Sequence, residues 1–466
     1  MQQGTQETES DATCGHPRVV PFCEFLEALT QALDREGLRS CVLRNYEGFP
    51  TDNFGNDVDF LIVQSELARA LRALRSIVNI RVVGFAEHPH VASVFLAGTS
   101  ATPGCRSLQI DFYGILGRKG MPYLPVDVVL QQAIRRRAGN VGFLVPSPVH
   151  EAIISLLTSL VVSAWLKEKY FPQVQRTFIS DKLEVISELS PQFGLKTATR
   201  LVDAVIDGDR SKVQDCVGPL RFSQSARSLL HRPLRTVSGI ARHYAMEFSI
   251  LYLPKGLETV RIIGPAGCGK TELIESLIPI LQSSAKVVEE LPARTRLPLG
   301  RTLVGNVASG NFPAEVPCSR FVSMANAVLW QAGEWLGQFI RTKNLLLRIC
   351  EGCYHDIFID PQKYRYGGPK WFAQLVGRFS PRFDLWILLD APAEVLEAKS
   401  PRLQPEEAVR QREEYRTFVM TRKRYVILDA SKPASVVMEE AYDAIIDTLA
   451  NRADRELRNR FGSRRS

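Results

Sequence analysis

The sequence predicts an α/β protein, with a parallel sheet and flanking helices at its C-terminal end, preceded by a smaller α+β domain and a helical segment. Three observations support this prediction. Apolar strand-like segments alternate with helical ones over residues 251–450, which is typical of a parallel sheet covered on both faces. Shorter strand and helix patterns alternate over residues 17–145. Between these two regions, residues 146–250 have helical apolar spacing.

Composition limits how these regions are arranged. A chain of 466 residues is too long for one ordinary core, so two or three domains are expected. The net charge of +8 suits a protein that handles anions, and phosphorylated metabolites, nucleotides, nucleic acid and membrane surfaces all fit. The nine cysteines are scattered, which indicates reduced thiols and a cytoplasmic location. No apolar run reaches about 18 residues, so no membrane-spanning helix is expected.

The boundaries and ends of the chain are marked by composition. Pro146 and Pro148 separate the first domain from the helical segment. Residues 1–16 are polar and are expected to be disordered. Residues 451–466 are rich in arginine, and we expect them to form a flexible basic tail.

Three aspartates in the first domain form a candidate metal site. Asp57 and Asp59 are two residues apart at the start of a predicted strand, so both should lie on one face of the sheet. Asp111 belongs to another predicted strand. Three carboxylates are suitable ligands for Mg²⁺, and two such ions can clamp a nucleotidyl transfer. The alternative is that Asp57 and Asp59 only form an acidic turn before an edge strand.

A glycine-rich loop opens the C-terminal region. The segment from Val260 to Thr271 matches the motif G-x-x-x-x-G-K-[ST] and lies between a predicted strand and a predicted helix, as the motif requires. Its glycines let backbone N–H groups converge on phosphate oxygens, and the helix start presents its positive end to the same anion. We therefore expect ATP and Mg²⁺ as ligands. The residues assigned to nucleotide binding are Gly264, Gly267, Cys268, Gly269, Lys270 and Thr271.

Two of these residues have distinct expected roles. Two carboxylates further along the chain are expected to face the same ligand crevice. Lys270 should contact the β- and γ-phosphates, and the Thr271 hydroxyl should ligate Mg²⁺. Glu351 and Asp390 each end a predicted strand, and such residues point into the ligand crevice of a parallel sheet. Glu351 is therefore a second candidate ligand for Mg²⁺. The alternative interpretation of Asp390 is that it only stabilises the turn before the Ala-Pro pair.

These segments resemble a known family. The chain is similar to thymidylate-kinase-like P-loop kinases in the glycine loop and in four further segments: Tyr354–Asp356, Asp360–Gly368, Leu388–Pro392 and Ile427–Ser431. In particular, it resembles a two-domain bacterial group, often encoded with surface-polysaccharide genes. In that group a nucleotidyltransferase-like domain, similar to the DNA polymerase β-type fold, precedes the kinase-like one. The resemblance implies a nucleoside-monophosphate-kinase-like sheet of five parallel strands in the C-terminal half.

The resemblance also implies roles for further residues. Ser431 would lie near adenine, and Arg294, Arg296 and Tyr354 would bind a small anionic acceptor. A mobile lid would follow Pro392, with Arg402 and Arg410 in catalytic roles. The basic lid candidates are Lys399, Arg402, Arg410 and Arg412.

Two departures from the family pattern concern the acceptor side. Ala266 stands where these kinases usually carry an acidic residue, and Glu351-Gly352 stands where they carry Asp-Arg. Glu334 is the candidate for the acidic residue expected in the preceding helix. Nucleotide binding is therefore expected to survive these changes better than thymidylate kinase activity.

The function favoured by the sequence is ATP-dependent phosphoryl transfer to a small phosphorylated or hydroxylated acceptor, related to a nucleotide or a sugar. The resemblance connects it with surface-polysaccharide metabolism. One alternative is a nucleotidyltransferase that acts through Asp57, Asp59 and Asp111, with a kinase-like half that only binds nucleotide. The other is a non-catalytic partner protein gated by nucleotide. Nucleic acid is not expected as a partner, and a homodimer is left open.

Overall fold

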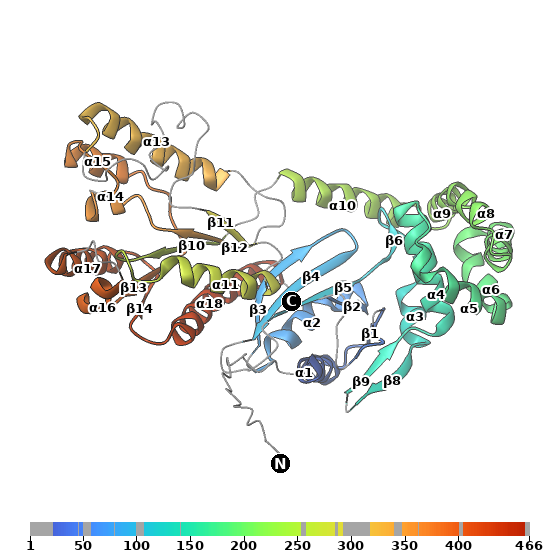
Figure 1. Ribbon diagram of the computed structural model, residues 1–466. Coiled ribbons are helices and arrows are strands. Elements are labelled where there is room, and N and C mark those ends of the chain that lie inside the picture. Colours follow the sequence, from blue (N-terminus) through green and yellow to red (C-terminus); the bar gives the residue numbers. More distant parts are fainter. Residues whose placement is uncertain are drawn as a thin grey trace, which may run out of the picture.

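The computed structural model contains an N-terminal sheet, a series of helices and a C-terminal sheet in chain order, here called the N-terminal domain, the helical segment and the C-terminal domain (Figure 1). The α/β class expected from the sequence is confirmed. The structure describes residues 22–44, 46–49, 57–78, 80–98, 107–139, 141–252, 258–284, 288–291, 317–339, 347–361, 363–399 and 404–461. The segment 1–16 lies outside these residues. No helix in the described ranges is long and apolar enough to cross a membrane.

The N-terminal domain is built on a mixed sheet of five strands in the order β1-β2-β5-β4-β3. Strands β2 and β5 are parallel, and the other neighbours are antiparallel. The strands are β1 (Ser40–Val42), β2 (Asp57–Ile62), β3 (Ile80–Glu87), β4 (Val91–Gly98) and β5 (Ser107–Tyr113). Its helices are α1 (Phe22–Arg35), the 3-10 turn η1 (Gln64–Glu66) and α2 (Leu67–Arg75).

The side chains of β2 alternate between the two faces of the sheet. Val58, Phe60 and Ile62 are buried on the face that α1 and α2 cover. Asp57 and Asp59 therefore project from the opposite face. The same strand thus contributes to a hydrophobic core on one side and to a polar site on the other.

The helical segment follows two short hairpins, and its hydrophobic core also includes Cys41 and Leu61 of the N-terminal sheet. The hairpin strands are β6 (Leu116–Arg118), β7 (Met121–Leu124), β8 (Ile134–Ala138) and β9 (Val141–Val145), with α3 (Val126–Gln131) between the hairpins. The first helical elements are α4 (Pro148–Leu157), the π-helix η2 (Thr158–Ser163) and the 3-10 turn η3 (Glu168–Tyr170). The remaining helices are α5 (Phe171–Ser180), α6 (Lys182–Phe193), α7 (Leu195–Ile206), α8 (Arg210–Asp215), α9 (Val217–His231) and α10 (Pro233–Tyr252).

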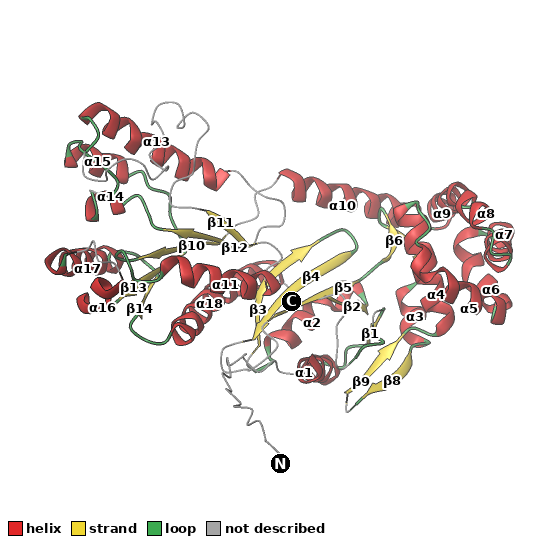
Figure 2. Cartoon of the chain, viewed as in Figure 1, coloured by secondary structure: helices red, strands yellow, loops and turns green. Residues whose placement is uncertain are grey.

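The C-terminal domain contains a parallel sheet of five strands in the order β11-β12-β10-β13-β14. Its strands are β10 (Glu258–Ile263), β11 (Val288–Leu291), β12 (Leu347–Glu351), β13 (Leu385–Asp390) and β14 (Tyr425–Asp429). Helices flank this sheet on both sides (Figure 2), with α11 and α18 on one face and α17 on the other. The helices are α11 (Lys270–Ser284), α13 (Arg320–Phe339), α14 (Asp356–Ile359), α15 (Lys370–Gly377), α16 (Ala393–Lys399), α17 (Pro405–Met420) and α18 (Ala434–Phe461).

The expected flexible tail is wrong for residues 451–461, because α18 continues through them. Ala453 and Leu457 are buried in the core of the N-terminal domain, and Phe461 packs against that core. These three residues recur every four positions, which is helical spacing. The surrounding arginines obscured this spacing in the sequence. Residues 462–466 lie outside the described part of the chain.

The two domains share a buried contact. Val83, Phe95 and Ala97 of the N-terminal sheet pack into the core that contains α11 and α18. The Tyr442 hydroxyl on α18 donates a hydrogen bond to the Gly98 carbonyl oxygen at 3.1 Å. The helix that begins at the glycine loop therefore packs against the sheet that carries the three aspartates.

Candidate functional site

The glycine loop joins β10 to α11, and its geometry requires glycine. Gly264, Gly267 and Gly269 have φ values of 151°, 82° and 89°, which other residues rarely adopt. A Cβ atom on Gly264 would lie 2.6 Å from the Leu389 carbonyl oxygen and 2.7 Å from Cys268 Sγ. The loop is therefore held close to the end of β13. Burial raises the pKa of the Cys268 thiol, so this residue packs the loop as a neutral group.

Lys270 folds back over this loop. Its Nζ atom donates hydrogen bonds to the carbonyl oxygens of Gly264 at 2.9 Å and Pro265 at 2.7 Å. The ammonium group is thereby held beside the start of α11, a helix of 15 residues. The positive helix end and the ammonium group together favour an anion at this point.

A hydroxyl and a carboxylate meet beside the loop. The Thr271 Oγ1 atom donates to Glu351 Oε2 at 3.3 Å, which connects the start of α11 with the end of β12. Because β10 and β12 are adjacent parallel strands, their carboxyl ends lie at the same edge of the sheet. A threonine hydroxyl and a carboxylate are hard oxygen ligands that fit Mg²⁺.

At the same sheet edge, two arginines of α17 bind Asp390. Arg412 Nε and Nη2 lie 2.5 and 3.0 Å from the two carboxylate oxygens of Asp390. Arg416 Nη1 lies 3.3 Å from Asp390 Oδ2. Sequence analysis assigned no role to Arg416, although its spacing of four residues from Arg412 on one helix was a usable signal.

The other residues predicted for the lid, the adenine site and the acceptor site lie in different surroundings. Arg410 is paired with Glu407 and Glu414 and donates to the Ile359 carbonyl oxygen at 2.6 Å, so its guanidinium is already engaged. Ser431 donates through its backbone N–H to Asp429 Oδ1 at 3.0 Å. Lys399 is exposed on α16. The positions of three predicted residues lie outside the described ranges: Arg294, Arg296 and Arg402.

Tyr354 is a buried residue rather than an open acceptor contact. Its hydroxyl donates to the Ala373 carbonyl oxygen at 3.1 Å, and its ring packs edge-on against Trp330. Glu334, expected on the acceptor side, is also buried and accepts from Arg261 Nη2 at 2.9 Å. Arg261 in turn donates to the Gly352 carbonyl oxygen at 2.7 Å. Arg261 therefore connects Glu334 on α13 with the residue that follows β12.

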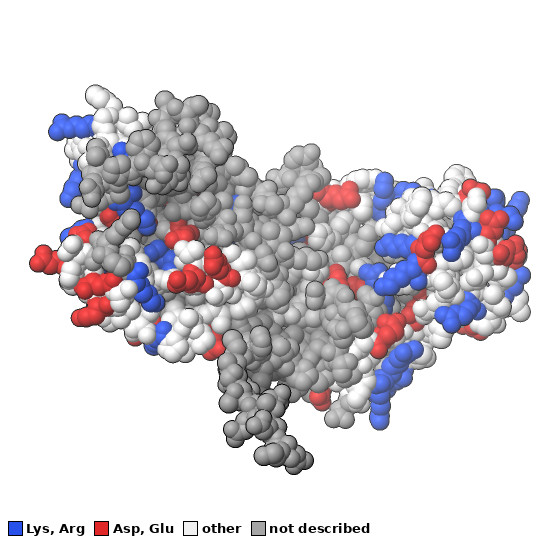
Figure 3. Space-filling view, viewed as in Figure 1, with Lys and Arg blue, Asp and Glu red and all other residues white. Residues whose placement is uncertain are grey.

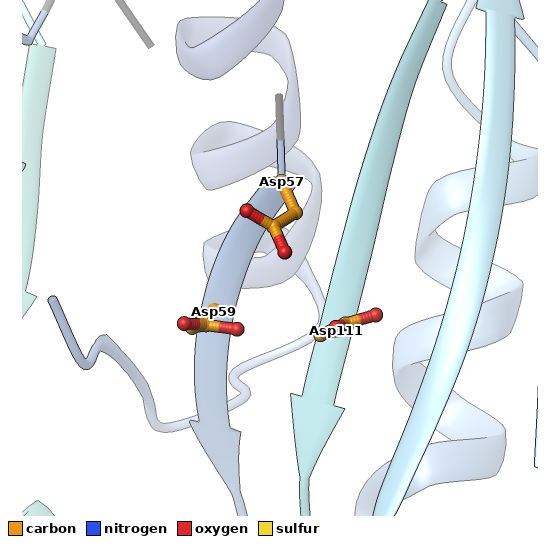
Figure 4. A group of neighbouring side chains, drawn as sticks. All are labelled: Asp57, Asp59 and Asp111. Atoms are coloured by element: carbon orange, nitrogen blue, oxygen red, sulfur yellow. The ribbon is translucent and has the colours of Figure 1, made fainter. Parts of the chain in front are cut away.

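The three aspartates of the N-terminal domain lie together (Figure 4). In the parallel pairing of β2 with β5, Asp59 is opposite Asp111 and Asp57 is opposite Gln109. One oxygen from each of the three carboxylates lies within 4.8 Å of the others. The Gln109 side-chain amide donates to Asp111 Oδ1 at 2.8 Å. The register of two strands therefore brings the carboxylates to one point.

Electrostatics at this cluster favour a cation. Burial raises the pKa of Asp59, while the ion pair with Arg44 lowers it and the charges of Asp57 and Asp111 raise it further. Arg44 balances one of the three negative charges. The Asp59 Oδ1 atom is buried and has no hydrogen-bond partner in the described structure. A divalent cation with oxygen ligands fits this donor set.

Comparison with known proteins gives little beyond these observations. No protein-family model matches the chain. No characterised protein matches it in sequence. The structure is similar to a thymidylate kinase from Ehrlichia chaffeensis over 40% of this chain and 97% of that chain, with 13% identity and a TM-score of 0.29. Similarity at this level does not indicate what the chain binds.

Proposed function

We propose that the C-terminal domain binds a nucleoside triphosphate with Mg²⁺ and transfers its terminal phosphoryl group to a small phosphorylated or hydroxylated acceptor. The observation that carries this proposal is the position of Lys270 and of the Thr271–Glu351 pair at the mouth of one glycine loop. The loop offers backbone N–H groups, an ammonium group and two oxygen ligands to one triphosphate. ATP is the triphosphate expected from the sequence.

The residues of the chain would act mainly by positioning and charge. Lys270 would exchange its two carbonyl partners for phosphate oxygens, because a charged acceptor forms the stronger hydrogen bond. Thr271 and Glu351 would hold Mg²⁺, which when bound neutralises charge on the phosphates. Arg412 and Arg416 are held at the same sheet edge by their ion pairs with Asp390, and they would reach a phosphoryl group there by exchanging this carboxylate for it.

The acceptor proposed here is not thymidine monophosphate. Ala266 carries no charge toward an acceptor, and Gly352 contributes no guanidinium. Arg261 contacts the Gly352 carbonyl but is itself buried with Glu334, so it does not replace the missing side chain. The family resemblance supports a nucleotide- or sugar-related acceptor used in surface-polysaccharide metabolism in the cytoplasm.

A label-transfer experiment tests this proposal. The full chain is incubated with Mg²⁺, a panel of sugar phosphates and nucleoside monophosphates, and ATP labelled at either the γ- or the α-phosphate. Transfer of the γ-label to an acceptor, absent in Lys270→Ala, is the expected result. If no acceptor of the panel receives the γ-label, the result counts against the proposal. Transfer of neither the γ- nor the α-label would favour a nucleotide-gated partner protein.

The aspartate cluster supports a second candidate function, nucleotidyl transfer in the N-terminal domain. The specific observation is the buried, unpartnered Asp59 Oδ1 atom beside two further carboxylates. Asp57, Asp59 and Asp111 would hold divalent metal, which when bound activates the attacking oxygen and stabilises the leaving group. Transfer of the α-label, lost in Asp111→Asn and kept in Lys270→Ala, would support this second function.

A further inference from the structure

Helix α10 carries an apolar stripe on its solvent-facing side. Thr236 and His243 are buried where the helix packs on the protein. On another side, apolar side chains recur at alternating intervals of three and four residues, the spacing of one helix face. The stripe consists of Leu234 (86% exposed), Val237 (58%), Ala241, Tyr244 (47%) and Phe248 (58%). Exposed apolar area of this extent marks an interaction surface.

Helix α9, which packs against α10, also carries exposed apolar side chains. Phe222 is 76% exposed, and Leu230 at the end of the helix is 78% exposed. Arg221 donates to the carbonyl oxygens of Val161 and Val162 in η2 at 3.0 and 3.2 Å. Val162 is itself exposed, so Arg221 lies beside a further exposed apolar residue.

The same two helices are strongly basic. Between Val217 and Tyr252 the chain has five arginines and a single acidic residue, Glu247, which gives a formal charge of +4. The arginines are Arg221, Arg227, Arg232, Arg235 and Arg242. Lys119 adds a further positive charge at the stripe, because its Nζ atom lies 2.8 Å from the Tyr244 hydroxyl. Blue side chains gather where α10 adjoins α9 (Figure 3).

Charge complementarity selects one kind of partner. A second copy of this chain would bring two positively charged faces together, which costs free energy. Nucleic acid would satisfy the arginines but would leave the leucines and phenylalanines exposed to water. An anionic lipid surface satisfies both, since phosphate headgroups bind exposed arginines such as Arg232 and Arg235 and the acyl boundary accepts the apolar side chains.

We propose that α9 and α10 bind the surface of an anionic phospholipid bilayer, with the stripe of α10 lying in the interface plane. Helix α10 contains 20 residues, which at ~1.5 Å per residue gives a contact roughly 30 Å long. The helix lies along the edge of the molecule between the two domains (Figure 1). Binding there would hold the protein at a membrane surface without inserting the chain.

Vesicle co-sedimentation of the full chain tests this proposal. We expect binding to vesicles of phosphatidylcholine mixed with phosphatidylglycerol, little binding to phosphatidylcholine alone, and weakening at ~1 M salt, where the Debye length falls to about 3 Å. The double substitution Leu234→Gln with Phe248→Gln should reduce binding at least tenfold. Arg232→Gln with Arg235→Gln should reduce it on anionic vesicles.

Matched controls make the result decisive. Leu183→Gln removes an equally exposed leucine (83%) on α6, outside the stripe, and should leave binding unchanged. Circular dichroism checks that each variant is folded. Equal binding to neutral and anionic vesicles, or equal loss in the Leu183 variant, would overturn the proposal. A dimer in sedimentation velocity that the Leu234/Phe248 variant converts to monomer would overturn it too, because the stripe would then join two copies.

Discussion

The glycine loop and the aspartate cluster differ in how their polar groups are satisfied. In the loop, Lys270 donates to two carbonyl oxygens of the loop itself, so the positive charge has partners before any ligand arrives. In the cluster, Asp59 has one partner in Arg44 and one buried oxygen without a partner. We infer that the loop would exchange its partners for phosphate, whereas the cluster would be completed by a cation.

The two sites also differ in the structures that place their residues. The loop depends on three glycines with positive φ, on the start of a helix and on the ends of parallel strands. The cluster lies within two strands, where the pairing of Asp59 with Asp111 fixes the carboxylates. The first arrangement suits an anion that is bound and released, and the second suits a tightly held ion.

The largest effect that we predict is a very low rate of phosphoryl transfer to thymidine monophosphate, because of residues on the acceptor side of the loop. With thymidine monophosphate and ATP, we expect turnover at least a hundredfold below the ordinary kinase range of roughly 1–100 s⁻¹. The reason is the uncharged Ala266 and Gly352 at the positions that would bind this acceptor. A coupled assay of nucleoside diphosphate formation measures it. Turnover within the ordinary range would show that these departures do not matter.

A substitution in the aspartate cluster should weaken metal binding there without affecting ATP binding at the glycine loop. Asp59→Asn should weaken Mn²⁺ binding at least tenfold, about 1.4 kcal/mol, because it removes a ligand charge from the cluster. ATP affinity should be unchanged. Electron paramagnetic resonance of free Mn²⁺ measures the first quantity, with Asp127→Asn, at an exposed position on α3, as the control. Equal Mn²⁺ affinity in wild type and Asp59→Asn would remove the metal site from the account.

The smallest effect that we predict is a pH dependence of stability. Burial raises the pKa of Asp59, so the folded protein holds this proton more tightly than the unfolded chain. The metal-free protein should therefore lose stability, on the order of a few degrees in Tm, as pH rises above ~3.9 and through the raised pKa. Mn²⁺ should restore it.

Thermal unfolding across this pH range, with and without Mn²⁺, measures the effect. Asp59→Asn cannot ionise at this position, so the fall in Tm should be smaller in this variant, and Mn²⁺ should have little influence. Identical pH profiles in wild type and Asp59→Asn would assign the effect to other carboxylates.

The parallel sheet and the loop were accessible from sequence because their signals are local. The motif from Gly264 to Thr271 follows an apolar strand directly, and Glu351 and Asp390 close later apolar runs. The aspartate pair was also local, since two residues on a strand share a face. The register that sets Asp111 opposite Asp59 could not be predicted from the sequence, because neither strand contains a pattern that identifies its distant partner.

Other features were missed because they depend on tertiary contacts. Arg44 reaches Asp59 because β1 pairs with β2, which no spacing in the sequence indicates. Tyr354 was assigned to the acceptor from its motif, but packing against Trp330 buries it. The end of α18 was mistaken for a tail because its arginines outnumber the apolar residues that dock it.

Calorimetric titration with ATP and Mg²⁺ tests the central claim, that the glycine loop is the nucleotide site, most directly. Wild type is compared with Lys270→Ala and with Lys423→Ala, which removes an exposed lysine of the same domain. The account predicts equal affinity in wild type and Lys423→Ala and at least tenfold weaker binding in Lys270→Ala, about 1.4 kcal/mol. Affinity that is the same in all three proteins would contradict it.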